Sequence, residues 1–462
     1  MFRIRQGLGS LAARDLQPIL GDLRKTNTAV AEAWPGERGD RQPVHTVYGG
    51  AHLFRANSAQ KLGALALTAL DQYAPDPAAF AQALGLTEMD TALVAMIRAR
   101  VADKLHREPV EDFRLDFEDG YGNRPDDEED GHAQAAAAEV AAGARTGTLP
   151  PFIGIRVKPL SRELHGRSLR TLDLFVTALS REAKKQIPPN FVITIPKIMA
   201  AGQVTAVCRA CNALERRIGL KPGVLKLELM IETPQSILGP DGSSPLRAFV
   251  AAGAGRVTGA HFGTYDYTAL CGITASWQHM RHPACDFAKH MMQVALAQSG
   301  VRLSDGATNV MPVPAHRPGP GGPLTDAQRR ENRGTVHRAW KMHFDDVTHS
   351  LVNGYYQGWD LHPAQLPTRY AAVFAFFLSA RRAATARLRN FVEKAAQATL
   401  VGDVFDDAAT GQGLLNFFVR GLNSGALTLD EARETGLTAE ELQGRSFLAI
   451  LENRRTRPPR KR

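Results

Sequence analysis

The run KLELMIETP, residues 226–234, has the pattern of a β-strand that passes directly into a helix. Apolar residues fill most of the interior of the run, with Glu228 as the exception, and Glu232 stands at its end, followed by Thr233 and Pro234. Proline suits the first turn of a helix, because an N–H group at that position has no partner within the helix. The run therefore indicates a buried strand that ends in a carboxylate where a helix begins.

Seven further strand-like runs flank this one, separated by segments with helix-like patterning such as 133–142 and 203–218. Strands that alternate with helices predict parallel βα units, and eight of them favour a closed (β/α)8 TIM barrel over an open sheet. The seventh run is the weakest. The predicted strands are Val44–Gly50, Phe113–Asp119, Phe152–Lys158, Phe191–Lys197, Lys226–Glu232, Val257–Asp266, Asp305–Val313 and Gly354–His362.

This α/β chain is expected to hold its barrel in residues 44–370. Residues 1–43 form an N-terminal helical segment and loop, with a helix predicted at Leu8–Thr28. Residues 371–462 are predicted to be a helical C-terminal extension with a basic tail. The Pro- and Gly-rich segment 312–323 is predicted to be a loop over the top of the barrel, either a lid or a plain connection.

Composition narrows the classes of partner and location. The net charge is +9, but six positive charges lie in the tail 454–462, so no basic face for specific nucleic-acid binding is expected. Neither a transmembrane segment nor a signal peptide is apparent. The four cysteines, among them Cys208 and Cys211, are too few for a disulfide framework and are expected to be free thiols in a cytoplasmic protein.

Charged residues gather where the predicted strands end. Catalytic residues of (β/α)8 barrels lie at the carboxyl ends of the strands, so these side chains are expected to surround one mouth. Acidic and basic groups that meet there suit a hard cation and a small anionic substrate. Glu232 and Asp266, on adjacent strands, can share one Mg²⁺. The predicted set is Asp116, Glu118, Asp119, Arg156, Lys158, Lys197, Glu232, Asp266 and His362.

Six motifs occur in order along the predicted barrel. They are RLDFEDG (114–120), IRVKPL (155–160), IPK (195–197), MIETP (230–234), FGTYDY (262–267) with Gly272, and LHPAQ (361–365). Together they resemble the HpcH/HpaI aldolase and citrate lyase β-subunit superfamily, which also includes malyl-CoA lyases and malate synthases. The chain looks like a divergent, aldolase-like branch, with helices added at both ends.

The resemblance implies roles for the residues at these positions. Glu232 and Asp266 would bind Mg²⁺, with Mn²⁺ as the alternative ion, and Arg156 would bind a 2-oxo acid or an enolate oxygen. Glu118 and Asp119 would hold metal-bound waters or lie behind the ligands, and Lys197 would orient the carboxylates. His362 and Gln365 are expected to shape the last strand-to-helix turn. Lys158 stands where the superfamily has asparagine, and Arg55 is the residue that can replace its first-strand arginine.

The implied function is that of a Mg²⁺-dependent carbon–carbon lyase or aldolase, acting through an enolate on a 2-oxo acid or acyl-CoA-type substrate. No CoA-side residues can be matched, so use of a CoA thioester stays open. The general base stays open among metal-bound hydroxide, Asp116, Glu118 and the C-terminal extension. A Schiff base at Lys197 is a minor option.

Two alternatives to this function remain, a phosphoenolpyruvate- or pyruvate-binding phosphoryl-transfer enzyme and an inactive barrel that acts as a binding protein. The first is disfavoured, because the chain has no G-x-x-x-x-G-K-[ST] loop. The second is disfavoured by the clustered charge, for which an unused site has no need. A homo-oligomer is expected.

Overall fold

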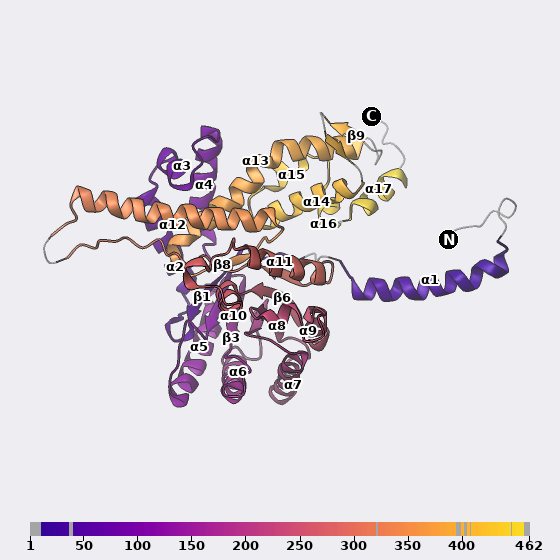
Figure 1. Ribbon diagram of the computed structural model, residues 1–462, viewed down its shortest axis with the longest axis horizontal. Helices are drawn as coiled ribbons and strands as arrows, with labels where there is room; N and C mark the ends of the chain where they lie inside the picture. The colour runs from indigo at the N-terminus through magenta and orange to yellow at the C-terminus, as the bar shows by residue number, and fades with distance from the viewer. Residues whose placement is uncertain are drawn as a thin grey trace.

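The computed structural model describes residues 11–36, 40–319, 322–393, 399–401, 404–406, 408–444 and 446–456. Eight parallel strands form a barrel with helices around it (Figure 1), which confirms the predicted (β/α)8 fold. The strands are β1 (His45–Gly50), β2 (Asp112–Asp116), β3 (Phe152–Arg156), β4 (Phe191–Ile195), β5 (Lys226–Ile231), β6 (Val257–Phe262), β7 (Arg302–Ser304) and β8 (Gly358–Asp360).

The barrel closes between its shortest strands. Along the sheet the order is β7-β6-β5-β4-β3-β2-β1-β8, so each strand lies beside its neighbour in the chain. A parallel bridge between Ala307 and Trp359 joins the two ends. The Asp305 N–H donates to the Gln357 carbonyl at 2.8 Å, and the Trp359 N–H donates to the Gly306 carbonyl at 3.0 Å. Closure therefore takes place just beyond the end of β7.

The predicted bounds of the sixth and seventh strands were wrong. The seventh strand is Arg302–Ser304 instead of Asp305–Val313. Asp305 is buried; its carboxylate accepts hydrogen bonds from Lys289 Nζ (3.0 Å) and Ser350 Oγ (2.6 Å), while its backbone N–H takes part in the closure with the segment before β8. The sixth strand ends at Phe262, and Asp266 lies in the first turn of the next helix.

Helices follow the strands and cover the outside of the barrel (Figure 1). Aspartate and threonine caps start several of them; Asp76, Asp90 and Thr325 each accept a hydrogen bond from a backbone N–H in the first turn. The helices are α2 (Ser58–Tyr73), α3 (Pro77–Leu84), α4 (Thr91–Arg107), α5 (Asp126–Thr146), α6 (His165–Glu182), α7 (Ala201–Ile218), α8 (Pro234–Ile237), α9 (Leu246–Ala252), α10 (Thr264–Leu270), α11 (Pro283–Leu296), α12 (Asp326–Val352) and α13 (Leu366–Glu393), with short 3₁₀ turns η1 (Ala51–Leu53), η2 (Ala275–Trp277) and η3 (Pro363–Gln365).

The barrel interior below the mouth holds a buried charged layer. Arg114 is fully buried and its guanidinium contacts Asp112 (2.7 Å) and Glu228 (2.6 Å). His261 Nε2 lies 3.1 Å from the same Glu228 carboxylate. Buried charges need close partners, because taking an unpaired charge out of water is costly. These paired charges form a layer inside the barrel, between its two ends.

The C-terminal extension packs on α13. Its elements are the hairpin β9 (Thr399–Val401) and β10 (Val404–Asp406), then α14 (Ala408–Asn423), α15 (Leu429–Arg433), α16 (Ala439–Gly444) and α17 (Phe447–Thr456). Leu415 and Phe418 of α14 are fully buried. Helix α13 runs across the predicted boundary after residue 370. In the basic tail, Arg454 is paired with Glu441 at 2.6 Å, while residues 457–462 lie outside the described residues.

The N-terminal helix α1 (Ala13–Ala33) extends away from the barrel (Figure 1), and none of its residues is buried. It begins and ends about five residues later than the predicted helix Leu8–Thr28, of which residues 8–10 lie outside the described residues. Where the helix ends beside the barrel, the Arg247 guanidinium lies 4.6 Å from the Trp34 ring centroid. None of the described helices is long and apolar enough to cross a membrane. All four cysteines are free, as predicted.

Candidate active site

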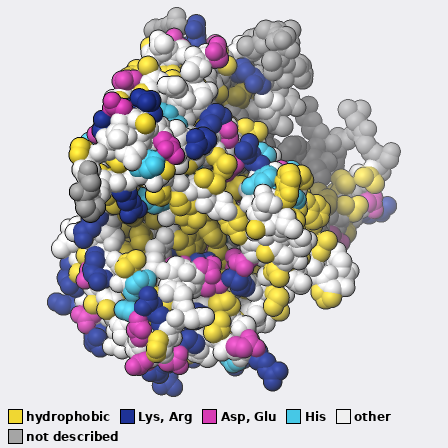
Figure 2. All heavy atoms as spheres, turned by 60° about the vertical axis from the view of Figure 1, so that its left-hand side comes forward, with side chains coloured by type: hydrophobic (Ala, Val, Ile, Leu, Met, Phe, Trp, Pro, Cys, Tyr) yellow, Lys and Arg dark blue, Asp and Glu magenta, His cyan; other side chains and the backbone are white. Residues whose placement is uncertain are grey.

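The candidate site lies at the mouth of the barrel, where the strands end. Lys197 follows β4, Glu232 follows β5, and Asp266 sits in the first turn of α10, just after β6. Figure 2, turned so that the side where β7 leads to α12 comes forward, shows a hollow with largely apolar walls. Acidic and basic side chains lie side by side along the lower edge of that hollow. The mouth is therefore both recessed and charged.

Glu232 is buried, with 1% of its surface exposed. One carboxylate oxygen, Oε1, accepts a hydrogen bond from the Lys197 backbone N–H at 2.7 Å. The backbone at Gly263, just after β6, passes very close to the Glu232 side chain, since a Cβ added to Gly263 would lie 2.4 Å from Glu232 Cβ. Glycine at this position of the FGTYD motif is therefore required by the close approach of β6 to the Glu232 side chain.

Lys197 connects the acidic groups of the mouth. Its backbone has φ near +50°, a conformation uncommon for residues other than glycine. This turn lets the backbone N–H reach Glu232 while Nζ extends to Glu118 Oε1 (2.5 Å) and Asp266 Oδ2 (3.0 Å). Burial acts to lower the pKa of the Lys197 ammonium, but the carboxylates of Glu232 and Glu118 outweigh it and raise that pKa. Lys197 thus stays charged and touches both predicted metal ligands.

Arg156 forms a second cationic centre. Its Nε and Nη2 donate to the two oxygens of Asp116 at 2.7 and 2.5 Å, and Nη1 lies 2.8 Å from Glu118 Oε2. Asp119 is mostly exposed and lies 3.6 Å from Nη2. The guanidinium carbon is 4.9 Å from the ring centroid of Tyr48. The sequence analysis did not predict Tyr48 as a site residue. Its signal was its place on the first strand, which lies between the second and eighth strands, both predicted to end in charged residues.

Asp116 and Glu118 differ in their electrostatic settings. The Asp116 carboxylate accepts backbone N–H groups of Glu118 (3.0 Å) and Gly120 (2.7 Å) in addition to the Arg156 pair. Burial acts to raise the pKa of Asp116, but Arg156 and these hydrogen bonds outweigh it and lower that pKa. For Glu118 burial prevails over Arg156 and Lys197, and its pKa is raised. Asp116 is therefore a fixed anion, whereas Glu118 is poised to take up a proton.

The cluster as a whole carries more negative than positive charge. Its carboxylates are Asp116, Glu118, Asp119, Glu232 and Asp266, and its cations are Arg156 and Lys197. Hard oxygen donors in such surplus fit a divalent cation such as Mg²⁺, which prefers one or two carboxylates and keeps several waters. Within the described part of the chain, no three or more His, Cys, Asp or Glu residues are grouped so that they could hold a metal ion together.

Comparisons with known proteins give the family and the fold of the chain. The family described as a domain of unknown function, DUF6986, matches residues 23–450. The chain belongs to this family. No curated protein matches it by sequence.

Solved structures give a likeness of fold. A citrate lyase from Burkholderia xenovorans superposes on this DUF6986 chain with a TM-score of 0.55 and 18% identity, covering 87% of this chain and 100% of that chain. At this identity the likeness shows the fold alone, and that fold is the one implied by the resemblance to the citrate lyase superfamily. A malate synthase from Haloferax volcanii in complex with magnesium and glyoxylate matches with a TM-score of 0.44 and 14% identity, covering 91% and 99% of the two chains. An HpcH/HpaI aldolase/citrate lyase family protein from Burkholderia cenocepacia gives 0.37 and 12%, covering 79% and 99%.

Four other predicted positions of this DUF6986 chain contact nearby backbone groups instead of the charged cluster at the mouth. Lys158 Nζ donates to the carbonyls of Phe117 (2.7 Å) and Gly122 (3.2 Å), which fastens the loop after β2. His362 accepts the Ala364 N–H through Nδ1, and Gln365 caps the same turn, in agreement with the structural role expected for both. Arg55 is exposed, and its guanidinium donates to nearby backbone carbonyls, including that of Phe54 at 2.6 Å.

The C-terminal extension does not face the mouth. Helix α14 lines a cavity together with Gln42, which precedes β1, and Arg302, which begins β7. Gln42 and Arg302 lie where strands start, so α14 faces the end of the barrel opposite the mouth. Helix α14 therefore supplies no general base to the mouth. In the loop 312–323, the described residue His316 is joined to Asn332 of α12 by reciprocal hydrogen bonds of 2.7 and 2.9 Å. Residues 320 and 321 of that loop lie outside the described residues.

The burial of Glu232 predicts an unusual pH dependence of stability. Burial first, and then the Glu118 carboxylate, raise the pKa of Glu232 to about 8 against the opposing effect of Lys197. Between about pH 4.5 and 8 the folded metal-free protein then holds a proton that the unfolded chain releases, so the free energy of unfolding falls as pH rises. The fall approaches about 1.4 kcal/mol per pH unit in that window. Urea unfolding at several pH values with a chelator present measures it.

Glu232→Gln should flatten this dependence, because the amide stays neutral at every pH in the window. Asp71→Asn, which alters a largely exposed carboxylate on α2, is the matched control and should leave the slope as it is. Equal slopes for wild type and Glu232→Gln would show that Glu232 does not carry this proton.

Proposed function

We propose that this protein is a Mg²⁺-dependent carbon–carbon lyase or aldolase that acts through an enolate on a 2-oxo acid or a related acyl-CoA-type substrate. The observation that carries the proposal is the linkage made by Lys197, whose backbone N–H holds Glu232 and whose ammonium holds Asp266 and Glu118. These groups lie at the carboxyl ends of barrel strands, which is where such barrels place their chemistry. A shared fold with a citrate lyase structure supports the same class.

Glu232 and Asp266 are the residues that would hold the metal ion. Glu232 follows β5 and Asp266 lies in the helix turn that follows the neighbouring strand β6, and both are contacted by the same lysine. Bound there with open positions, Mg²⁺ supplies a Lewis acid that polarises a substrate carbonyl and stabilises the enolate oxygen. Lys197 would keep the two carboxyl groups in place when the site is empty.

Arg156 would bind the anionic part of the substrate. Two of its N–H groups donate to Asp116, and Nη1 lies 2.8 Å from Glu118 Oε2. A guanidinium has five N–H groups, so donors remain on Nη1 and Nη2. Asp116 fixes the plane of the guanidinium with two hydrogen bonds. A planar, fixed donor of this kind suits a carboxylate or an oxygen that gains negative charge as the carbon–carbon bond breaks.

Glu118 is the residue suited to move the proton. In a retro-aldol cleavage the substrate hydroxyl gives up its proton and becomes a carbonyl, while the electrons of the broken carbon–carbon bond form the enolate. The buried Glu118 has a raised pKa, whereas that of Asp116 is lowered, so Glu118 is the better proton acceptor of the two beside Arg156. The same group can return the proton to the enolate carbon.

The proposal is tested by metal binding and turnover measured together. Mn²⁺ titration read by EPR, with and without pyruvate or oxaloacetate, should show one tight site whose signal changes on adding the 2-oxo acid. Glu232→Gln and Asp266→Asn each remove one hard anionic ligand, and both should weaken Mn²⁺ binding by at least about tenfold, with activity partly restored at high Mg²⁺.

The control for these variants is Asp71→Asn, which should bind Mn²⁺ like wild type. If wild type binds no Mn²⁺, or if both ligand variants bind it unchanged, the metal site is wrong. If metal binds as expected but no 2-oxo acid or acyl-CoA perturbs its signal or is cleaved, the assigned reaction class is wrong.

A further inference from the structure

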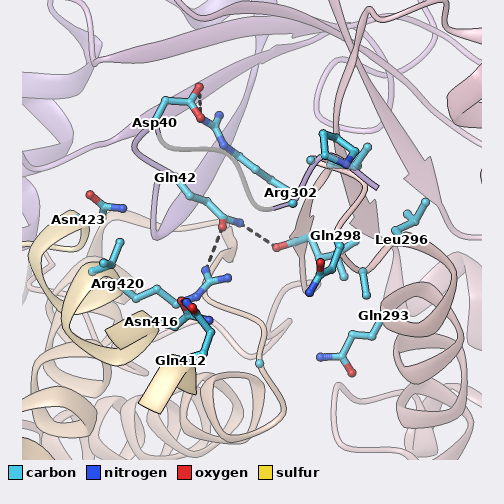
Figure 3. Close-up of a pocket in the computed structure, with 18 of the residues that line it drawn as sticks. Asp40, Gln42, Gln293, Leu296, Gln298, Arg302, Gln412, Asn416, Arg420 and Asn423 are labelled. Atoms are coloured by element: carbon cyan, nitrogen blue, oxygen red, sulfur yellow. Dashed lines mark hydrogen bonds and ion pairs between the residues drawn. The ribbon is translucent and has the colours of Figure 1, made fainter. Parts of the chain in front are cut away.

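A second cavity lies at the opposite end of the barrel from the candidate active site. It has a volume of about 630 Å³, within the range of small-molecule sites. One wall comes from Gln42 before β1, the end of α11 and the start of β7, and the other comes from α14 of the C-terminal extension. Figure 3 shows these two walls facing each other across the space, with polar side chains on both.

The α14 wall presents a polar stripe. Gln412, Asn416, Arg420 and Asn423 repeat at helical spacing and line the cavity, while Leu415 on another side of the helix is buried. On a helix packed against its own chain, the side facing inward is usually apolar. Here an inward side carries carboxamides and a guanidinium, and all four of these side chains are half-buried. The stripe faces this partly open cavity instead of the packed interior, an arrangement that suits a polar ligand.

The facing wall repeats this chemistry. Gln42, Gln293 and Gln298 line it, and Arg302 at the start of β7 is paired with Asp40 at 2.7 Å. A carboxamide both donates and accepts hydrogen bonds, as a sugar hydroxyl does, so carboxamides on opposite walls suit a ligand with several hydroxyl groups. Leu296 and Val419 add apolar surface of the kind on which the C–H face of a sugar ring packs.

Arg420 selects for an anionic group on that ligand. Its guanidinium carbon lies 4.0 Å from the Tyr356 ring centroid, and Nη1 is 3.5 Å from Gln42 Oε1. Stacking on the ring holds the guanidinium in one plane, and a planar guanidinium matches a phosphate in two-pronged geometry. The described charged residues of the lining are two arginines and one aspartate, which favours an anion over a cation.

We propose that this cavity is a binding site for a phosphorylated sugar, separate from the lyase site at the mouth. The ligand would bridge α14 and the strand starts, and so would fasten the C-terminal extension to the barrel. Because it contacts neither Glu232 nor Asp266, its binding does not depend on the proposed function. Anything that binds the folded state alone also raises its stability.

Calorimetric titration of the full chain with glucose 6-phosphate tests the proposal. We expect a dissociation constant below about 1 mM, with glucose and inorganic phosphate each binding at least about tenfold more weakly. Arg420→Met keeps the apolar contact with Tyr356 but loses the charge, and Asn416→Leu fills part of the cavity. Each should weaken glucose 6-phosphate binding by about tenfold or more.

Arg382→Met on α13, which changes an exposed arginine outside the cavity, is the matched control and should bind like wild type. Circular dichroism and melting temperature verify that each variant is folded. Absence of glucose 6-phosphate binding to the folded wild type overturns the proposal, as does binding that survives both cavity variants. Phosphate alone binding as tightly as the sugar phosphate would also overturn it, because the site would then recognise only an anion.

Discussion

Replacing Arg156 with lysine is expected to lower kcat by about 10²–10³, the usual effect of losing one donor to a developing oxyanion. Lysine keeps the charge, so Asp116 and Glu118 remain neutralised and the fold should be retained. It loses the planar fork that now holds Asp116 through Nε and Nη2 and leaves donors for substrate. Steady-state kinetics with a 2-oxo acid substrate and Mn²⁺ titration by EPR provide the two measurements.

The two measurements separate substrate binding from metal binding. Mn²⁺ affinity should stay near the wild-type value in Arg156→Lys, because the ion-pair partners of Arg156 are Asp116, Glu118 and Asp119 and include neither Glu232 nor Asp266. Arg170→Lys, on the exposed surface of α6, is the matched substitution and should leave kcat unchanged. If Arg156→Lys loses metal while retaining turnover, the roles assigned to the arginine and the carboxylates are reversed.

Replacing Arg369 with methionine is expected to lower the free energy of unfolding by about 3–5 kcal/mol, because it leaves a buried carboxylate without its guanidinium. Asp360 at the end of β8 is fully buried and accepts from Arg369 Nη2 at 2.9 Å. His45 and His343 also contact it, at 2.8 and 3.0 Å. Burial acts to raise the pKa of Asp360, but Arg369 and the two histidines outweigh it and hold that pKa well below its usual range.

The sign of the pH effect follows from that shift. A carboxyl whose pKa is lowered by folding adds stability that is complete above its unfolded pKa near 4 and is lost as pH falls below it. The difference between wild type and Arg369→Met should therefore be largest near neutral pH and shrink in acid. Urea unfolding at several pH values measures it. Arg107→Met, which breaks an exposed pair with Asp103, should cost less than about 1 kcal/mol, and an equal cost for both would show that Asp360 does not need its arginine.

Much of the fold was predictable because buried parallel strands are short apolar runs between helices. Strands β1 to β5 lie within two residues of their predicted bounds at most ends. β7 was not predictable, because it has only three residues. Two of them are half-buried and one is buried, so the strand shows no alternation between a buried and an exposed face. Its extent depends on Asp305, whose partners Lys289 and Ser350 are distant in the sequence, so no local pattern could reveal them.

The candidate site was predictable as a set of residues but not as an arrangement. Charged residues at strand ends mark the mouth, because all parallel strands of a barrel point the same way. Which of these charged side chains form ion pairs depends on differences of a few ångströms in their positions. Lys197 joins Glu118 and Asp266 only because its backbone adopts a left-handed conformation. Likewise, the contrast between Asp116 and Glu118 arises from burial and hydrogen bonds that no pattern of residue types contains.

By itself, the sequence determined the (β/α)8 barrel, the flanking helices and the residues that meet at its mouth, because apolar periodicity and strand order are local properties of the chain. The tertiary structure decided the rest. It placed α14 at the opposite end of the barrel, where Gln412, Asn416 and Arg420 face a cavity instead of the mouth. It also buried Glu232 among like charges. Both outcomes depend on packing between segments that are far apart in the chain. The free energies of burial and of Coulomb interaction are set by distances between atoms in space, not by the order of residues.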